Sequence, residues 1–300
     1  MEYGGVTASF TEAWRYLMSK RDPRTKDMLF IGDLRFIVTV LGLYLYIVYH
    51  GGPRFMRNRQ PYNLKGPIMA YNFAMVVLNL FFMFKFFQHS FWYGGYSFFC
   101  QGMTHSTDYH ALMLLDYSWW YLFVRIGDFL DTFFFLLRKK FSHLTALHVS
   151  HHALVVWSGW LWLAFGGDGQ VLLGMCVNAG MHVVMYTYYF LSALGPAFQR
   201  FIWWKRYLTQ LQLAQFVTVC MHSMSYLFYK EGSIPGFTLI MVSEAVVFLV
   251  WFLSFYSNVY RKGGRTTMDI VSSTAVAAKE ALAKVASSCC PEPLNENKDE

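Results

Sequence analysis

Long apolar runs with few charged residues constrain the fold of this chain more than any other feature of its sequence. Such runs, near ~20 residues each, recur between residues 34 and 260, and a helix needs about 20 apolar residues to cross the hydrocarbon core of a bilayer. Their approximate bounds are 34–50, 67–88, 112–137, 143–165, 171–191, 206–229 and 236–260. The sequence therefore predicts an all-α integral membrane protein with seven transmembrane helices.

The composition agrees with a membrane protein. Of the 300 residues, 55% are hydrophobic and only 14% are charged, whereas soluble domains carry about 25% charged residues. We expect an N-terminal segment over 1–33, one seven-helix membrane domain over 34–262, and an exposed, mobile tail over 263–300. The five cysteines cannot pair completely, and their positions imply no disulfide framework.

The positions of Lys and Arg predict the orientation of the spans. Basic residues gather in alternate connections and at the start of the tail: Arg54, Arg57, Arg59 and Lys65, then Arg138, Lys139 and Lys140, then Arg200, Lys205 and Arg206, then Arg261, Lys262 and Arg265. Because basic loops stay in the cytosol, we predict that these faces are cytosolic and that the nearly bare connections 166–170 and 230–235 are luminal. This orientation places the N-terminus in the lumen and the C-terminus in the cytosol, although four basic residues of segment 20–26 precede the first span. The net charge of +7 is interpreted as juxtamembrane anchoring, with no nucleic acid as a partner.

Polar side chains inside the predicted spans fall into four sets. A charged side chain in a bilayer costs roughly 2.5–3.5 kcal/mol by insertion scales, so those present usually face a protein or water-filled interior. The sets are Arg125, Asp128 and Asp131 in the third span; His148, His151 and His152 in the fourth; Asn178, His182, Tyr186 and Tyr189 in the fifth; and Thr209, Gln212 and Gln215 in the sixth. At about 1.5 Å per residue and in the predicted orientation, all four sets lie between the cytosolic surface and mid-bilayer. They predict a polar chamber that opens to the cytosol and continues toward the lumen as an apolar tunnel.

Each set, taken singly, also has a structural interpretation. Arg125 and its aspartates fit an ion-pair cluster that ties helices together, and a lone membrane histidine is more often a packing residue. The tyrosines fit an aromatic belt, and the glutamines fit interhelical hydrogen bonds. The convergence of four helices in one half of the membrane favours the chamber.

The histidine spacing in "HVSHH" at 148–152 is compatible with more than one chemistry. It occurs in membrane di-iron desaturases and oxygenases, but this chain has ten histidines and only one such box, too few for two irons. A mononuclear site with three histidine ligands would leave His182 and the acidic pair unexplained, so we predict no metal. Imidazole as a base or nucleophile fits better, because it forms reactive acyl-imidazoles, and a second histidine on a facing helix can stabilise an enolate oxygen.

Four ordered motifs carry a resemblance to a known family. "RIGDFLDT", "HVSHH", "HVVMYTYY" and "TQLQLAQ", in this spacing, resemble the KxxExxDT, HxxHH, HxxMYxYY and TxxQxxQ motifs of the very-long-chain fatty acid elongases. The segment "SALGPAFQRFIWWKRYLTQLQ" at 192–212 is especially similar to animal members. The resemblance implies a seven-helix enzyme of the endoplasmic reticulum membrane, a 3-oxoacyl-CoA synthase. Such an enzyme condenses long-chain acyl-CoA with malonyl-CoA and releases CO2, CoA and a 3-oxoacyl-CoA two carbons longer.

The resemblance also implies roles for particular residues. His148, His151 and His152 form the catalytic box, His182 is their partner across the tunnel, and His151 is the acyl acceptor. Basic residues at the cytosolic mouth would attract the CoA phosphates; the candidates are Lys139, Lys140, Lys205 and Arg206. No cofactor is expected beyond the two CoA substrates. The expected partners are the lipid bilayer, the reductase and dehydratase enzymes of the elongation cycle, and further elongase subunits in a homo- or hetero-oligomer.

Two departures and two alternatives accompany the resemblance. Arg125 and Asp128 replace the family's Lys and Glu; the charges persist, but the shorter carboxylate must find its partner differently. The family's dilysine retrieval pattern is reduced to Lys298. A histidine-box membrane iron oxygenase is the main alternative. A seven-helix receptor explains the span count, but its ligand chamber usually faces outward.

Overall fold

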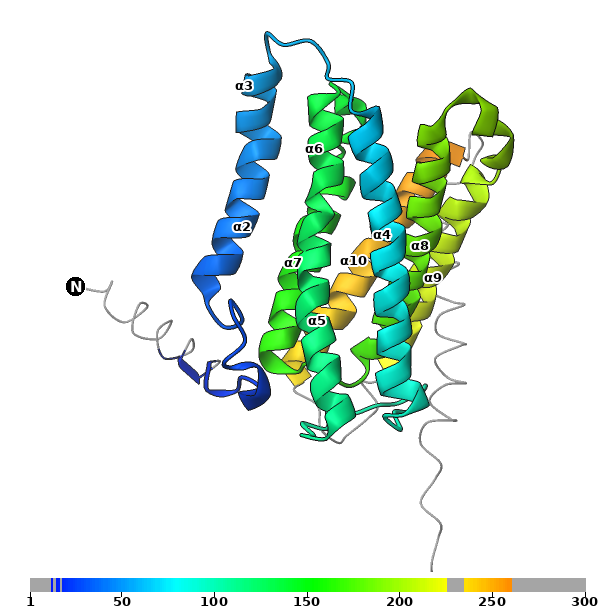
Figure 1. Ribbon diagram of the computed structural model, residues 1–300. Coiled ribbons are helices and arrows are strands. Elements are labelled where there is room, and N and C mark those ends of the chain that lie inside the picture. The colour runs from blue at the N-terminus through cyan, green and yellow to red at the C-terminus, as the bar shows by residue number, and fades with distance from the viewer. Residues whose placement is uncertain (1–11, 13–14, 17, 226–234, 261–300) are drawn as a thin grey trace, which may run out of the picture.

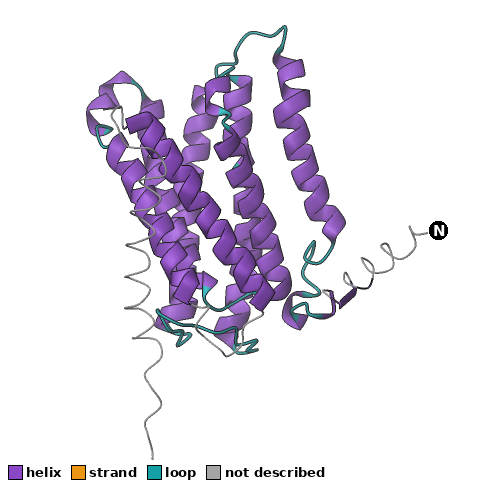
Figure 2. Cartoon of the chain, turned by 180° about the vertical axis from the view of Figure 1, so that it is seen from behind, coloured by secondary structure: helices purple, strands orange, loops and turns teal. Residues whose placement is uncertain are grey.

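The chain folds into a bundle of helices in the computed structural model, which describes residues 12, 15–16, 18–225 and 235–260 (Figure 1). No strand occurs within these ranges, as the view from behind also shows (Figure 2). The α-helices are α2 (Leu34–Tyr46), α3 (Gly52–Met56), α4 (Lys65–Phe87), α5 (Tyr109–Gly127), α6 (Phe129–Leu137), α7 (Ala146–Phe165), α8 (Val171–Leu194), α9 (Lys205–Ser225) and α10 (Pro235–Tyr260). The prediction of an all-α protein is confirmed for this part of the chain.

Several of these helices have the length and composition of membrane spans. In the described ranges, three are long and apolar enough to cross a bilayer, namely Leu34–Met56, Lys65–Trp92 and Val171–Leu194, and a shorter apolar helix covers Val242–Ser257. Every predicted span overlaps a helix, yet the crossing of the membrane by all seven stays a prediction. The domain boundaries also stay predictions, because the expected tail at 263–300 lies outside the described residues.

The helix ends differ from the predicted span ends for local reasons. The first helix continues past residue 50, because a π-helical turn at Ile47–Gly51 leads directly into α3. Pro53 lies in the first turn of α3, where a missing N–H costs little. The fourth begins at Ala146 instead of 143, because the Thr145 side chain caps it by accepting a hydrogen bond from the His148 N–H at 3.2 Å.

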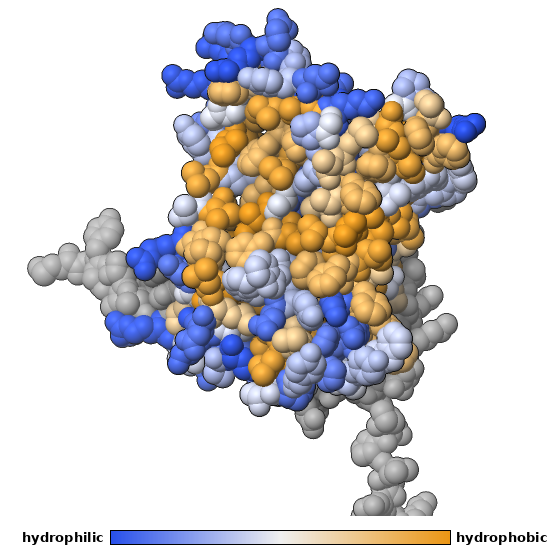
Figure 3. Space-filling model, in the orientation of Figure 1, coloured by the Kyte–Doolittle hydropathy of each residue, from blue (hydrophilic) through white to orange (hydrophobic). Residues whose placement is uncertain are grey.

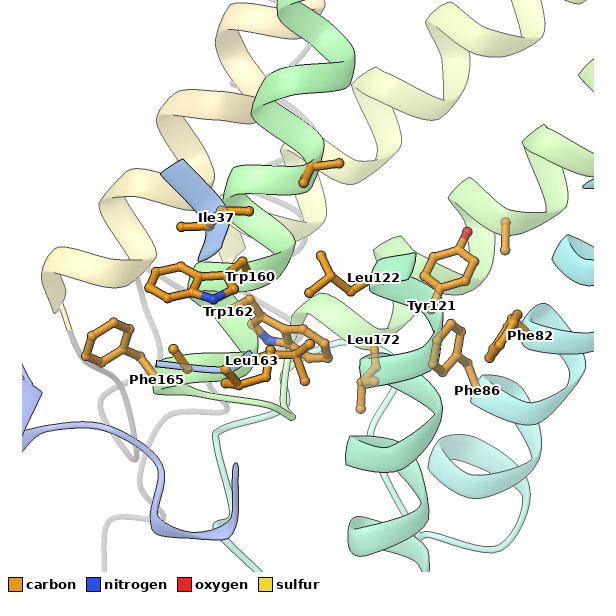
Figure 4. Close-up of a cluster of buried hydrophobic side chains, with 14 of the residues drawn as sticks. Ile37, Phe82, Phe86, Tyr121, Leu122, Trp160, Trp162, Leu163, Phe165 and Leu172 are labelled. Carbon is orange, nitrogen blue, oxygen red and sulfur yellow. The ribbon is translucent and has the colours of Figure 1, made fainter. Parts of the chain in front are cut away.

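Apolar side chains pack between the helices at one end of the bundle and cover its outside. Figure 4 shows Trp160 and Trp162 of α7 beside Leu122 of α5 and Leu172 of α8, with Ile37 of α2 close by. The face of the bundle seen in Figure 3 carries a broad apolar band with hydrophilic residues toward both ends. An outward-facing apolar band of this kind suits contact with lipid.

The N-terminal segment is held against the connection between α7 and α8. The Asp22 N–H donates to the Ala164 carbonyl at 3.0 Å, and the buried Arg24 guanidinium contacts Asp22 at 2.6 Å and Asp168 at 3.1 Å. Burial alone would raise the pKa of the Asp22 carboxyl, but the hydrogen bonds and charge of Arg24 outweigh burial and hold that pKa below its usual value. Segment 22–24 and connection 166–170 therefore lie at the same end of the bundle.

Candidate active site

The first polar set lies around the junction of α5 and α6. Asp128 separates the two helices, and Arg125 lies in the last turn of α5. Both side chains are buried, with 4% and 2% of their surface exposed, and the Arg125 Nη1 atom lies 3.1 Å from the Asp128 Oδ2 atom. The i, i+3 spacing thus creates an ion pair that is shielded from solvent.

The Arg125 guanidinium joins three helices. Its Nη1 atom lies 3.0 Å from both ring nitrogens of His182 on α8, and its Nη2 atom donates to the Asn79 Oδ1 atom on α4 at 2.6 Å. A guanidinium can only donate, so the imidazole nitrogen that receives this bond carries no proton and the His182 ring is neutral. Because Nη1 is equally far from both ring nitrogens, either of them can be the acceptor, and the other keeps the single ring proton.

Tyr186 lies at the centre of the acidic residues. Its buried hydroxyl is 2.7 Å from Asp131 Oδ2, 2.9 Å from Asp128 Oδ1 and 3.1 Å from the Tyr71 hydroxyl. A single hydroxyl proton can satisfy only one carboxylate at a time. The cluster therefore shares a small number of protons among four oxygen-bearing groups beside the Arg125 cation.

Two residues of the histidine box face the same polar region. The His148 Nε2 atom lies 3.0 Å from the Thr132 hydroxyl, which is 3.0 Å from the Tyr44 hydroxyl on α2. The rings of His148 and His152 are one helical turn apart, with centroids 4.5 Å from each other. His152 is buried and lies within electrostatic range of His182. The box and the facing histidine are therefore neighbours.

His151 has different surroundings from the other two. Its ring centroid lies 4.8 Å from that of Phe248 and 6.2 Å from that of Phe252 on α10, and 6.4 Å from that of Phe216 on α9. It also lies within electrostatic range of Arg125. His151 thus has an apolar lining on one side and faces the polar cluster around Arg125 on its other side.

The remaining predicted residues lie around this centre. Thr209 is buried, and its hydroxyl contacts the Lys205 carbonyl of its own helix at 3.4 Å, while the Gln212 amide nitrogen lies 3.6 Å from the Met185 sulfur. Gln215 is buried and Asn178 is half-buried. Tyr189 is 38% exposed, with its ring 6.0 Å from that of Tyr186, so it reaches the outer surface of the bundle.

The predicted basic mouth lies at the end of the bundle opposite Asp22 (Figure 1). Lys139 is half-buried in a left-handed backbone conformation with φ of 54°, whereas Lys140 and Lys205 are exposed. The side chain of Arg206 lies outside the part of the structure that is described. The described lysines are placed to meet an anion that approaches this end.

Sequence reasoning missed several polar residues that complete the site. Asn79 and Tyr71 of α4, Tyr121 of α5, and the Thr132–Tyr44 pair each supply hydrogen bonds to the predicted residues or their partners. The only available signal was the presence of Asn in an otherwise apolar run, as in "YNFAMVVLN". A second missed pair lies between α7 and α10, where the Ser158 hydroxyl is 2.9 Å from the Glu244 Oε1 atom.

The side chains of the site do not form a set of metal ligands in the part of the chain that the structure describes. Within the described ranges, no group of three or more His, Cys, Asp or Glu is arranged to hold a metal ion. The Arg125 cation beside His182 would also oppose a second cation there. These residues suit proton transfer and anion stabilisation better than metal binding.

Comparisons with known proteins find one family over most of the chain. The family model described as "ELO: GNS1/SUR4 family" matches residues 29–268. The chain is 38% identical to very long chain fatty acid elongase 7 of Rattus norvegicus over 262 residues, covering 86% of this chain and 92% of that protein. It is 34% identical to very long chain fatty acid elongase 4 of Homo sapiens over 275 residues, covering 90% and 87% of the two chains.

Proposed function

The chain belongs to the ELO (GNS1/SUR4) family, and on that premise we propose that it is a 3-oxoacyl-CoA synthase, the condensing enzyme of fatty acid elongation. It joins a long-chain acyl-CoA to the two-carbon unit of malonyl-CoA and releases CO2 and CoA. The observation that carries the proposal is the buried contact between Arg125 and His182, with the histidine box beside it. This contact supports the proposal because it pairs a buried imidazole with a fixed cation close to a second set of imidazoles.

The first half of the reaction is assigned to His151. Its unprotonated ring nitrogen attacks the thioester carbon, the C–S bond breaks, and CoA leaves as the thiolate. The acyl-imidazolium loses its ring proton to a neighbouring imidazole of the box, and the product is a neutral acyl-imidazole. The phenylalanines around His151 give the apolar acyl chain a compatible wall.

The second half is assigned to His182. Malonyl-CoA loses CO2, and the electron pair of the broken C–C bond forms an enolate whose oxygen accepts the His182 N–H. The enolate carbon attacks the acyl carbonyl, the C–N bond to His151 breaks, and the imidazole recovers its proton. Arg125 adds positive charge near the developing anion and holds the His182 ring in its neutral form.

The membrane arrangement completes the proposal. The helices form seven spans of the endoplasmic reticulum membrane around a tunnel open to the cytosol, with a luminal N-terminus and a cytosolic C-terminus. Lys139, Lys140 and Lys205 attract the CoA phosphates to the mouth. The product passes to the reductase of the elongation cycle and then to the dehydratase, which act on the 3-oxo group that this reaction creates.

One experiment tests the proposed order of events. The purified protein is incubated with acyl-CoA alone, and free CoA and acylated protein are measured before malonyl-CoA is added. We expect an acyl adduct on His151, absent from His151→Ala, that malonyl-CoA discharges as 3-oxoacyl-CoA. If elongation proceeds at the normal rate without early CoA or an acyl-protein species, the histidines act only in proton transfer during a direct condensation.

A further inference from the structure

Asn79 is a fully buried amide in the middle of the apolar helix α4. None of its surface is exposed, and no motif of the sequence includes it. A buried amide costs free energy unless its donors and acceptors are paired. The Nδ2 atom donates to the Met75 carbonyl of the same helix at 2.8 Å, which fixes the rotation of the amide group.

The carbonyl oxygen of this amide receives two donors. The Arg125 Nη2 atom donates to the Oδ1 atom at 2.6 Å, and the Tyr121 hydroxyl donates to it at 3.1 Å. Both lone pairs of the Asn79 oxygen are therefore occupied. The shorter of the two bonds is charge-assisted, and such bonds are roughly twice as strong as those between neutral groups.

We propose that Asn79 is a positioning residue for the condensation, acting through Arg125 on His182. The guanidinium is a rigid planar fork, so a bond that fixes the direction of Nη2 also fixes the direction of Nη1. In this structure Nη1 lies 3.0 Å from the His182 ring and 3.1 Å from Asp128. This inference rests on the proposed function, because it assigns His182 to the malonyl-CoA half of the reaction.

The charges around Arg125 explain why an anchor is needed on the α4 side. Asp128 lies one turn after Arg125, and Asp131 follows one turn later, so both carboxylates attract the guanidinium toward α6. The Asn79 oxygen holds the other arm of the fork from the opposite side. Without it, the guanidinium is free to rotate toward the carboxylates and away from the imidazole.

Three variants separate positioning from packing. Asn79→Leu keeps the side-chain volume and removes the acceptor, whereas Asn79→Asp keeps the volume and the acceptor oxygen and loses only the donor to the Met75 carbonyl. If Asn79 served only to fill space in a membrane helix, Leu would be tolerated better than a buried Asp. If it anchors Arg125, Asp retains the anchor and Leu does not. Tyr121→Phe is the matched control, because it removes the second donor to the same oxygen and leaves the Arg125 bond in place.

The readouts are the rate of condensation, KM for acyl-CoA, and CoA release from acyl-CoA alone. We expect Asn79→Leu to lower kcat by about 10- to 100-fold, since a misplacement near 1 Å in an active site can cost that much. KM and CoA release should stay near the wild-type values, because both precede the step that needs His182. Asn79→Asp should retain at least a third of the wild-type kcat, and Tyr121→Phe should cost less than Asn79→Leu.

A double-mutant cycle with Arg125→Lys completes the test. A lysine is a point charge that cannot bridge Asn79 and His182 with a fixed geometry, so Asn79→Leu should have little further effect in that background. Equal losses for Asn79→Leu and Asn79→Asp, or additive losses with Arg125→Lys, would overturn the inference. A wild-type protein that does not elongate any acyl-CoA would instead overturn the proposed function. If Asn79→Leu fails to fold, the comparison of Asn79→Asp with Tyr121→Phe decides. A larger loss of kcat in Asn79→Asp than in Tyr121→Phe would then count against the anchor.

Discussion

Replacing Arg125 by methionine removes a buried cation while keeping most of the side-chain volume. Two unit charges at the observed 3.1 Å attract each other by about 5 kcal/mol at an effective dielectric constant near 20. Removing one member of a buried pair typically costs about 3–5 kcal/mol, because the other charge stays buried without compensation. We therefore expect Arg125→Met to lower the free energy of unfolding by about 3–5 kcal/mol, measured in detergent micelles, and to abolish condensation.

A second substitution distinguishes the charge effect from the catalytic effect. Asp128→Asn in the Arg125→Met background removes the uncompensated carboxylate, since replacing both partners of a buried pair is often close to neutral. The double variant should recover most of the lost stability and still fail to condense, because nothing then holds the His182 ring. Wild-type stability in Arg125→Met alone, or condensation by the stable double variant, would refute the reasoning. Thermal unfolding, acyl-CoA binding and product formation measured on the same samples give the answer.

Three further predictions concern other parts of the chain. Because the folded-state pKa of Asp22 is lowered, the ion pair of Asp22 stabilises the folded state fully above the unfolded pKa of about 3.9, and this contribution is lost as the pH falls through the folded pKa. The Tm difference between wild type and Asp22→Asn should therefore shrink on acidification, and a constant difference would contradict this. Single cysteines placed in connection 138–142 should react with a reagent added outside sealed microsomes, whereas those in 166–170 should be protected; the reverse pattern would invert the predicted orientation. Ser158→Ala should lower the free energy of unfolding by about 1 kcal/mol, because Glu244 loses its partner and hydrogen bonds between membrane helices contribute about 0.6–1.7 kcal/mol. An unchanged Tm would show that this bond contributes nothing measurable.

The positions of the helices followed from the sequence because a bilayer sets their length. The fifth predicted span, 171–191, corresponds to α8 at Val171–Leu194, and the sixth overlaps α9 at Lys205–Ser225. Hydropathy alone does not locate the break between α5 and α6 at Asp128, because an average over a window does not show which single residue leaves the helix. The helix boundaries set by a single hydroxyl cap, as at Thr145, are equally invisible to a window of about 19 residues.

The pairing of site residues was less predictable than the residues themselves. Periodicity identifies which side chains share a face of one helix, but not how that helix is rotated relative to its neighbours. The i, i+3, i+4 spacing grouped the histidines of the box, whereas the structure gives His151 an aromatic lining from α9 and α10 that its neighbours do not share. Asn79 has its partner Arg125 on another helix, 46 residues away, and an asparagine in an apolar run has no spacing that points to such a partner.

The two surroundings of the histidines fit the two substrates of the proposed reaction. His151 lies against phenylalanines, so an acyl chain bound there exchanges water for apolar side chains, and the thioester carbon is brought to the imidazole by its own tail. His182 lies against a guanidinium, and positive charge of this kind is what the enolate oxygen of the proposed second half would need. Under the proposed reaction, the apolar surroundings of His151 serve the acyl group in the first half and the polar surroundings of His182 serve the malonyl group in the second.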